Sequence, residues 1–211
     1  MCVCVCVCVC VCAQSRPSDT QTAPPTKDSN GLVGSFPPEL LRLTNMATLL
    51  LQRNSISGTL PLLGLSGLTA LEELDIRSNH LNGTIPREMY SLPALERLRM
   101  GRNRFSGTLP TILGQLSRLT HLDVSSNNVG GTLPTQMYDL SGLQKLQLAM
   151  NQLEGELSQD LAQLVGLREL TLYAKKQPKW DNSNSFGAVG SVERAGLVGS
   201  PSVGHTPEPT R

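Results

Sequence analysis

The segment LPALERLRMGRNRFSGTLP, residues 92–110, is the most informative part of this 211-residue chain for predicting its fold. Within it Leu98 and Met100 alternate with charged residues, which is the period-2 pattern of a strand buried on one face. The positions that we expect to face inward are Leu92, Leu95, Leu98, Met100, Asn103, Phe105 and Leu109. One unit of this size cannot bury its leucines alone, so the pattern requires stacked copies.

The copies recur at a nearly fixed period. The separations of the asparagines that follow each predicted strand are 24, 25, 24, 24 and 24 residues, for Asn30, Asn54, Asn79, Asn103, Asn127 and Asn151. The inward pairs of the predicted strands are Leu49/Leu51, Leu74/Ile76, Leu98/Met100, Leu122/Val124 and Leu146/Leu148. A period this regular predicts a solenoid, in which each coil buries its apolar residues against its neighbours.

Each asparagine stands where the chain must turn away from its strand. Its amide both donates and accepts hydrogen bonds, so it can satisfy backbone groups that a tight turn leaves unpaired, at about 1–3 kcal/mol each. Gly107 permits a sharp bend, and Pro110 fixes the chain as it starts across the outer face. The asparagines to which we assign this structural role are Asn54, Asn79, Asn103, Asn127 and Asn151.

The repeats resemble the plant-type leucine-rich repeat, whose unit runs LxxLxxLxLxxNxLxGxIPxxLGxL. The matching text includes LTALEELDIRSNHLNGTIP (68–86) and LSRLTHLDVSSNNVGGTLP (116–134), and the resemblance covers roughly residues 29–174. It implies an α/β fold, a curved right-handed solenoid with a parallel sheet on its concave face. It also implies a module that binds proteins, peptides or glycans there, often as the outer part of receptor-like kinases, receptor-like proteins or secreted enzyme inhibitors.

The resemblance leaves the biological setting open. No cysteine follows Cys12, so the paired-cysteine caps of the family are missing, and neither a transmembrane segment nor a kinase motif follows the repeats. We expect a receptor-like, signalling module that recognises a protein or peptide at the cell surface or outside the cell. The alternatives are an intracellular scaffolding repeat protein and a fragment of a larger receptor-like kinase.

The sequence outside the repeats differs in composition. Residues 1–28 begin MCVCVCVCVCVC and continue as a polar, proline-bearing segment, and we expect low complexity and disorder there. The Cys-Val alternation is typical of a translated dinucleotide repeat, although a soft-metal site, a disulfide cluster or a makeshift signal sequence are alternatives. The repeat domain is expected over residues 29–175, and residues 176–211, rich in Gly, Ser and Pro, are expected to be a disordered tail.

The sequence offers little for catalysis. Its three histidines share no metal-ligand spacing, and there is no HExxH, CxxC pair, phosphate-binding glycine loop or GxSxG motif. Asp75 and Asp123 would lie about 10 Å apart, two strands apart in a sheet, which suits an inverting glycosidase, but Arg99 stands between them. With a net charge of +1 and 3% aromatic residues, nucleic acid is also not indicated. We expect no enzyme, no cofactor and no metal.

The concave face carries the candidate ligand-binding residues, Arg77, Arg97, Arg99, Arg102, His121 and Tyr173. The Arg97-x-Arg99 pair is similar to the Arg-x-Arg with which some plant peptide-hormone receptors hold a terminal carboxylate. The other interpretation is a charge ladder, because Arg97 neighbours Glu73 and Arg99 is flanked by Asp75 and Asp123. Cross-strand pairs of this kind contribute about 0.2–1 kcal/mol.

Four arginines have fewer acidic neighbours on adjacent predicted strands than Arg97 and Arg99 have, and they would form a basic stripe along one rim. They are Arg53, Arg77, Arg102 and Arg104. Such a stripe predicts an acidic protein or peptide as partner, with a glycan as the alternative.

Two further features lie off this face. Asn82-Gly83-Thr84 is an N-glycosylation sequon, which matters if the chain enters the secretory route. Tyr90 and Tyr138 occupy matching outer positions two coils apart, where we expect isolated surface tyrosines or a convex contact.

Overall fold

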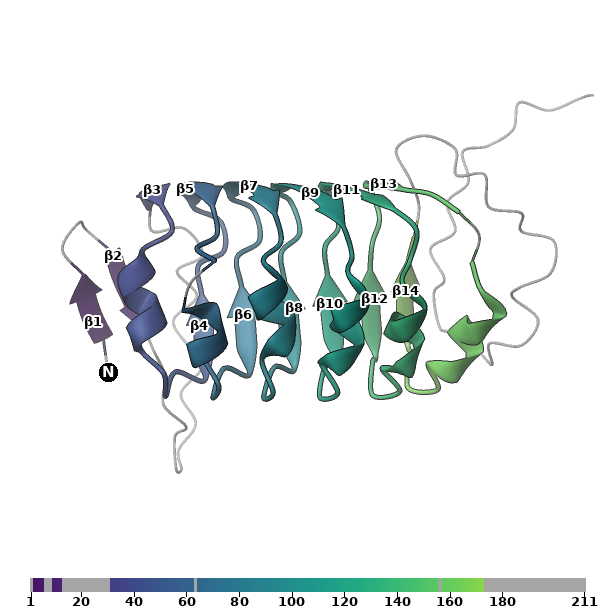
Figure 1. Ribbon diagram of the computed structural model, residues 1–211. Coiled ribbons are helices and arrows are strands. Elements are labelled where there is room, and N and C mark those ends of the chain that lie inside the picture. The colour runs from purple at the N-terminus through teal and green to yellow at the C-terminus, as the bar shows by residue number, and fades with distance from the viewer. Residues whose placement is uncertain (1, 6–8, 13–30, 63, 156, 173–211) are drawn as a thin grey trace, which may run out of the picture.

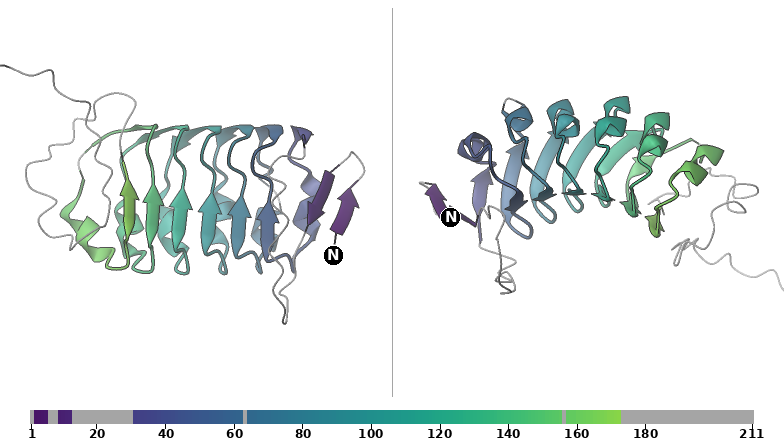
Figure 2. Two further views of the ribbon diagram at one scale, coloured as in Figure 1. Left: turned by 180° about the vertical axis from the view of Figure 1, so that it is seen from behind. Right: turned by 90° about the horizontal axis from the view of Figure 1, so that it is seen from below.

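The computed structural model describes residues 2–5, 9–12, 31–62, 64–155 and 157–172. The repeats form a stack of coils, each of which passes from an inner strand through a turn to a second strand and back over a short helix (Figure 1). The right-hand view of Figure 2 shows that the stack is curved, with the helices on the convex side and the inner strands on the concave side. The predicted leucine-rich repeat solenoid is therefore confirmed.

The inner sheet has six parallel strands in the order β14-β12-β10-β8-β6-β4. They are β4 (Thr48–Leu50), β6 (Glu73–Asp75), β8 (Arg97–Arg99), β10 (His121–Asp123), β12 (Lys145–Gln147) and β14 (Glu169–Thr171). Register places each residue beside its counterpart one coil away, so Arg97 lies between Glu73 and His121. The columns of side chains expected from the repeat therefore exist on this face.

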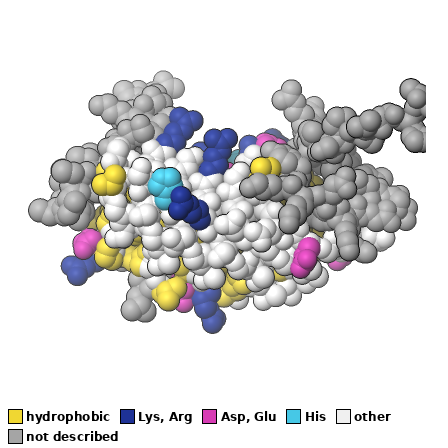
Figure 3. Space-filling model, turned by 90° about the horizontal axis from the view of Figure 1, so that it is seen from above, with side chains coloured by type: hydrophobic (Ala, Val, Ile, Leu, Met, Phe, Trp, Pro, Cys, Tyr) yellow, Lys and Arg dark blue, Asp and Glu magenta, His cyan; other side chains and the backbone are white. Residues whose placement is uncertain are grey.

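A second six-stranded parallel sheet was not anticipated from the sequence. It contains β3 (Val33–Ser35), β5 (Ser55–Thr59), β7 (His80–Thr84), β9 (Arg104–Thr108), β11 (Asn128–Gly131) and β13 (Gln152–Leu153). Coils of nearly equal length, 24 or 25 residues, bring the post-turn segments side by side. Gly107 has a left-handed φ of +84°, and a Cβ there would lie 3.0 Å from Thr84 Cγ2. Few charged or apolar side chains cover the outer face of this sheet (Figure 3).

The convex side carries one short 3-10 helix per coil. These are η1 (Pro38–Arg42), η2 (Leu65–Gly67), η3 (Arg87–Ser91), η4 (Thr111–Gln115), η5 (Thr135–Asp139) and η6 (Gln159–Gln163). Four of them begin directly after a proline, at Pro37, Pro86, Pro110 and Pro134, because its fixed φ starts the turn across the outer face. In the part of the chain that the structure describes, no helix has the length and apolar character needed to cross a bilayer.

The core is the leucine stack between the two sheets and the helices. All seven positions predicted to face inward in residues 92–110 are buried. The expectation of surface tyrosines is wrong, because Tyr90 and Tyr138 are 0% and 3% exposed and pack with the leucines. The Tyr90 hydroxyl has no hydrogen-bond partner among the described residues, and burial raises its pKa.

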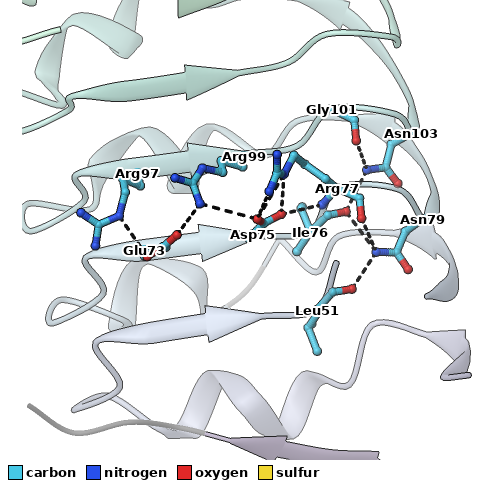
Figure 4. A network of polar contacts seen from close by, with 10 residues as sticks. All are labelled: Leu51, Glu73, Asp75, Ile76, Arg77, Asn79, Arg97, Arg99, Gly101 and Asn103. Carbon is cyan, nitrogen blue, oxygen red and sulfur yellow. Dashed lines mark hydrogen bonds and ion pairs between the residues drawn. The ribbon is translucent and has the colours of Figure 1, made fainter. Parts of the chain in front are cut away.

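The asparagines form the predicted ladder along the turns (Figure 4). Asn103 Nδ2 donates to the carbonyls of Met100 in its own coil, at 3.0 Å, and Ile76 in the preceding coil, at 2.9 Å. Its Oδ1 accepts the backbone N–H of Leu81 at 3.1 Å. Asn79, Asn127 and Asn151 repeat this arrangement, and Asn54 accepts the N–H of Leu32. Each amide therefore ties two coils together.

Near the N-terminus, β1 (Cys2–Val5) and β2 (Val9–Cys12) form an antiparallel hairpin with Cys2 opposite Cys12. The hairpin lies at the first coil, with β2 near β4 (Figure 1). Asn30, Tyr173 and most of the two predicted tails lie outside the described residues. The domain boundaries at 28/29 and 175/176 therefore stay predictions.

Candidate functional site

The inner sheet places most of the predicted ligand-binding residues on one face. Arg97 and Arg99 flank the buried Leu98 on β8, and His121 begins β10 in the neighbouring position. Arg77 follows β6 and Arg102 follows β8, at the side where the chain turns. Tyr173 lies outside the described residues, so its place on this face is still a prediction.

Arg97 and Arg99 are held by the same carboxylate (Figure 4). Arg97 Nε donates to Glu73 Oε2 at 2.9 Å, and Arg99 Nη1 donates to Glu73 Oε1 at 2.7 Å. Arg99 also lies 3.8 Å from Asp75 Oδ2, but it forms no ion pair with Asp123. The predicted charge ladder is present on the side of Glu73 and Asp75, and a ligand carboxylate at Arg97-x-Arg99 would compete with Glu73.

Arg77 is not short of acidic neighbours, which corrects the reading of the basic stripe. Its Nε and Nη2 donate to both carboxylate oxygens of Asp75, and the shortest contact, from Nη2 to Oδ2, is 2.7 Å. This hydrogen bonding to Asp75 raises the pKa of Arg77. The basic stripe was predicted from neighbours on adjacent strands alone. Asp75 precedes Arg77 by two residues in the sequence, so the two side chains point to the same side of the sheet.

Arg102 is the exposed cation of the turn. Its backbone has a left-handed φ of 58°, like that of the equivalent residue in four other coils. Its side chain forms no ion pair with any residue in the described ranges. Arg104, the fourth member of the predicted stripe, is placed differently, because it lies exposed on β9 in the second sheet.

Two adjoining hollows lie on the concave face. The first, of about 350 Å³, is lined by Gln52, Arg53, Arg77, Ser78, Arg102, Asp123, Ser125 and Gln147. The second, of about 270 Å³, is lined by Arg77, Arg99, His121, Leu122, Asp123, Lys145 and Gln147. The structure thus brings together four of the predicted residues, Arg77, Arg99, Arg102 and His121, while Arg97 lies beside the hollows.

Sequence reasoning missed Asp123 and Gln147 as site residues, although both line both hollows. The sequence did contain a feature that could have indicated them, because the repeat places Asp123 and Gln147 in the same column of side chains as Arg99. The catalytic reading of Asp75 with Asp123 finds no support, because Arg77 binds both oxygens of Asp75.

His121 adds a titratable group to the second hollow. Its Nδ1 lies 2.9 Å from Thr120 Oγ1. Burial lowers its pKa, and the charges of Arg99, Arg97 and Lys145 lower it further. A neutral imidazole is therefore favoured at neutral pH, and acidification adds positive charge to this face.

The sequon lies elsewhere. Asn82 is exposed on β7, paired with Thr59 and Arg104 of the neighbouring strands of the second sheet. A glycan at this position would cover the second sheet and leave the concave hollows open.

Known proteins match this repeat architecture. Family models described as leucine-rich repeats match residues 44–105 and 116–132. The ectodomain of the Arabidopsis thaliana receptor kinase GASSHO1/SCHENGEN3, solved with CASPARIAN STRIP INTEGRITY FACTOR 2, is 32% identical over 68% of this chain and 17% of that one, with a TM-score of 0.65. No curated protein sequence matches the chain.

Two other solved structures extend the comparison. The Arabidopsis receptor kinase HAESA, with the peptide hormone IDA and the co-receptor SERK1, is 30% identical over 71% of this chain and 26% of that one, with a TM-score of 0.64. The ectodomain of the Arabidopsis thaliana receptor kinase SOBIR1 is 30% identical over 61% of this chain, with a TM-score of 0.55. The chain spans 72% of the SOBIR1 ectodomain, but about a quarter or less of the other two.

Proposed function

Because this chain belongs to the plant-type leucine-rich repeat family, we propose that it is a non-catalytic, receptor-like module that binds an acidic peptide on its concave face. Two of the similar structures, those of HAESA and GASSHO1/SCHENGEN3, were solved with a peptide hormone or an integrity factor bound. Those receptors are several times longer than this chain, so the proposal must rest on the chain's own residues.

The observation that carries the proposal is the guanidinium of Arg102 at the first hollow, which forms no ion pair with any described residue. Three arginines and one carboxylate line that hollow, and the Asp75 that neutralises Arg77 lies beneath the surface at 1% exposure. Arg102 is therefore the side chain best placed to form a new ion pair with an incoming acid. Guanidinium groups suit this role because their planar donors match a carboxylate.

The test begins with a selection of random peptides displayed on phage against the purified full-length chain. Acidic peptides are expected to be enriched. Calorimetry then compares their binding to the wild type, to Arg102→Glu and to Arg87→Glu, the matched control on the convex helix η3, where Arg87 is exposed. We expect Arg102→Glu to weaken binding about tenfold or more, and Arg87→Glu to leave it within about twofold.

Equal weakening by both variants would show a general charge effect, and unchanged binding in Arg102→Glu would refute the proposed contact. Enrichment of neutral peptides would contradict the acidic partner. Binding of oligosaccharides in place of peptides would favour the glycan alternative.

The receptor-like role also predicts passage through the secretory route. Chain isolated from its natural source should then carry a glycan on the exposed Asn82, which intact mass spectrometry would detect. A chain with an unmodified Asn82 would instead support the intracellular scaffold.

A further inference from the structure

Asp123 is a buried carboxylate with one oxygen in use. It is 7% exposed, and its Oδ1 accepts hydrogen bonds from the backbone N–H of Ser125 at 2.9 Å and from Ser125 Oγ at 2.6 Å. Its Oδ2 receives no hydrogen bond and no ion pair from any residue in the described ranges. Because Oδ2 is not fully buried, it can accept a further hydrogen bond from a group that enters the hollow.

Asp75 provides the comparison, because it occupies the same position two coils earlier. Its Oδ1 likewise accepts a backbone N–H two residues on, that of Arg77 at 3.1 Å. The Arg77 guanidinium then occupies both oxygens. At Asp123 the residue two positions on is Ser125, whose short side chain reaches only Oδ1. The same backbone arrangement thus leaves one carboxylate saturated and the other open.

Gly101 makes the space in which this carboxylate lies. It stands between Arg77 and Ser125 in its column, and Figure 4 shows it beside Asn103, at the turn side of the ladder. A Cβ at position 101 would lie 2.8 Å and 2.9 Å from the two oxygens of Asp123. Because the φ of Gly101 is not left-handed, glycine is needed here for space. Asp123 borders both hollows, so its free oxygen is available to a ligand.

The surrounding charges select the kind of donor. Arg77, Arg99 and Lys145 line the hollows together with Asp123, and each forms an ion pair, with Asp75, Glu73 and Glu169 respectively. Arg102 forms no ion pair with a described residue, so its charge disfavours a cationic donor at this place, whereas a neutral N–H is not repelled. A peptide main chain supplies such an N–H close to the carboxylate of an acidic side chain.

We infer that Asp123 accepts a hydrogen bond from a main-chain N–H of the bound peptide, while Arg102 binds the adjacent acidic side chain. This inference rests on the proposed function and deepens it. Recognition is then of an acidic residue with a free amide hydrogen, and Gly101 is a positioning residue that sets the carboxylate in place.

The experiment uses NMR of the full chain with three small probes. N-acetyl-L-aspartate N′-methylamide carries the acid and two N–H groups, its doubly N-methylated analogue carries the acid alone, and acetate carries only a carboxylate. The NMR chemical shift of the Asp123 carboxyl carbon should change when the first probe is added and should not change with the other two. The Arg102 guanidinium signal should respond to all three.

Equal responses of Asp123 to the first two probes, or no response to either, would overturn the inference. An Arg102 signal that ignores all three probes would instead count against the proposed function, so the two failures are distinguishable.

A variant pair tests the same point with the selected peptides. Gly101→Ala displaces the Asp123 carboxylate, and it should weaken binding about tenfold, as expected for one hydrogen bond to a charged group. Gly142→Ala is the matched control, because its Cβ would make only an ordinary contact, 3.9 Å from the Leu119 oxygen. Thermal unfolding verifies that both variants are folded. Equal affinities of the two folded variants would contradict the positioning role.

Discussion

Replacing Asn103 by alanine tests the ladder that joins the coils. Asn103 is 9% exposed, and its amide serves three backbone groups at good distance, the carbonyls of Ile76 and Met100 and the N–H of Leu81. A fourth contact, to the Gly101 carbonyl at 3.4 Å, is weak. Alanine would remove the acceptor of the Leu81 N–H, while the carbonyls of Ile76 and Met100 would keep the amides of Asn79 and Asn127 as donors, each at 3.1 Å.

The expected loss follows from these contacts. The Leu81 N–H would lose its side-chain acceptor, which costs about 1–3 kcal/mol, and each carbonyl would lose one of two amide donors, at about 0.5–1.5 kcal/mol each. Partial relaxation and entry of water reduce the sum, so we expect Asn103→Ala to lower the free energy of unfolding by about 2–4 kcal/mol. Asn128→Ala is the control, because Asn128 is exposed on β11, and it should change stability by no more than about 0.5 kcal/mol.

Urea unfolding followed by circular dichroism measures both variants. The midpoint of Asn103→Ala should fall clearly below that of the wild type, while Asn128→Ala should coincide with it. A loss below about 1 kcal/mol in Asn103→Ala would contradict the stabilising role of the ladder, because the backbone groups would then have found other partners at little cost.

Two further predictions concern buried and titrating side chains. Tyr90→Phe should leave the free energy of unfolding unchanged or raise it by up to about 1–2 kcal/mol, because it removes a hydroxyl that is buried without a partner among the described residues. Urea unfolding measures this change. A clear loss of stability would show that the hydroxyl forms a hydrogen bond. The lowered pKa of His121 means that the unfolded chain binds its proton first as pH falls below 6.5. Stability should therefore decrease with acidification in that window, less so in His121→Gln, and identical pH profiles of unfolding would contradict the shift.

The solenoid could be predicted from the sequence because the residues that build each coil recur at a regular spacing. Asn103 and its counterparts recur at 24 or 25 residues, and the buried leucines recur with them. The second sheet was missed because glycines such as Gly107 interrupt the alternation of its strands, and the pairing arises only when equal coils stack. Tyr90 was misplaced because its burial depends on how the helices pack against the core.

The site was less predictable than the fold, because its properties depend on side-chain pairing. The columns of the repeat placed Arg97 beside Glu73 correctly. They did not reveal that Arg77 folds back onto Asp75 in its own chain segment. Nor did they show that Oδ2 of Asp123, beside Gly101, has no partner among the described residues, since that depends on the short reach of Ser125 and on the missing side chain of Gly101.

A bulky side chain placed on each sheet in turn would show which sheet binds the ligand. Gln147 lines both concave hollows, and Ser57 is exposed on β5 in the second sheet. Calorimetry with the selected acidic peptides should show that Gln147→Trp loses binding, by about tenfold or more, while Ser57→Trp retains it. Retained binding in a folded Gln147→Trp variant, with loss in Ser57→Trp, would place the ligand on the second sheet and contradict the concave site.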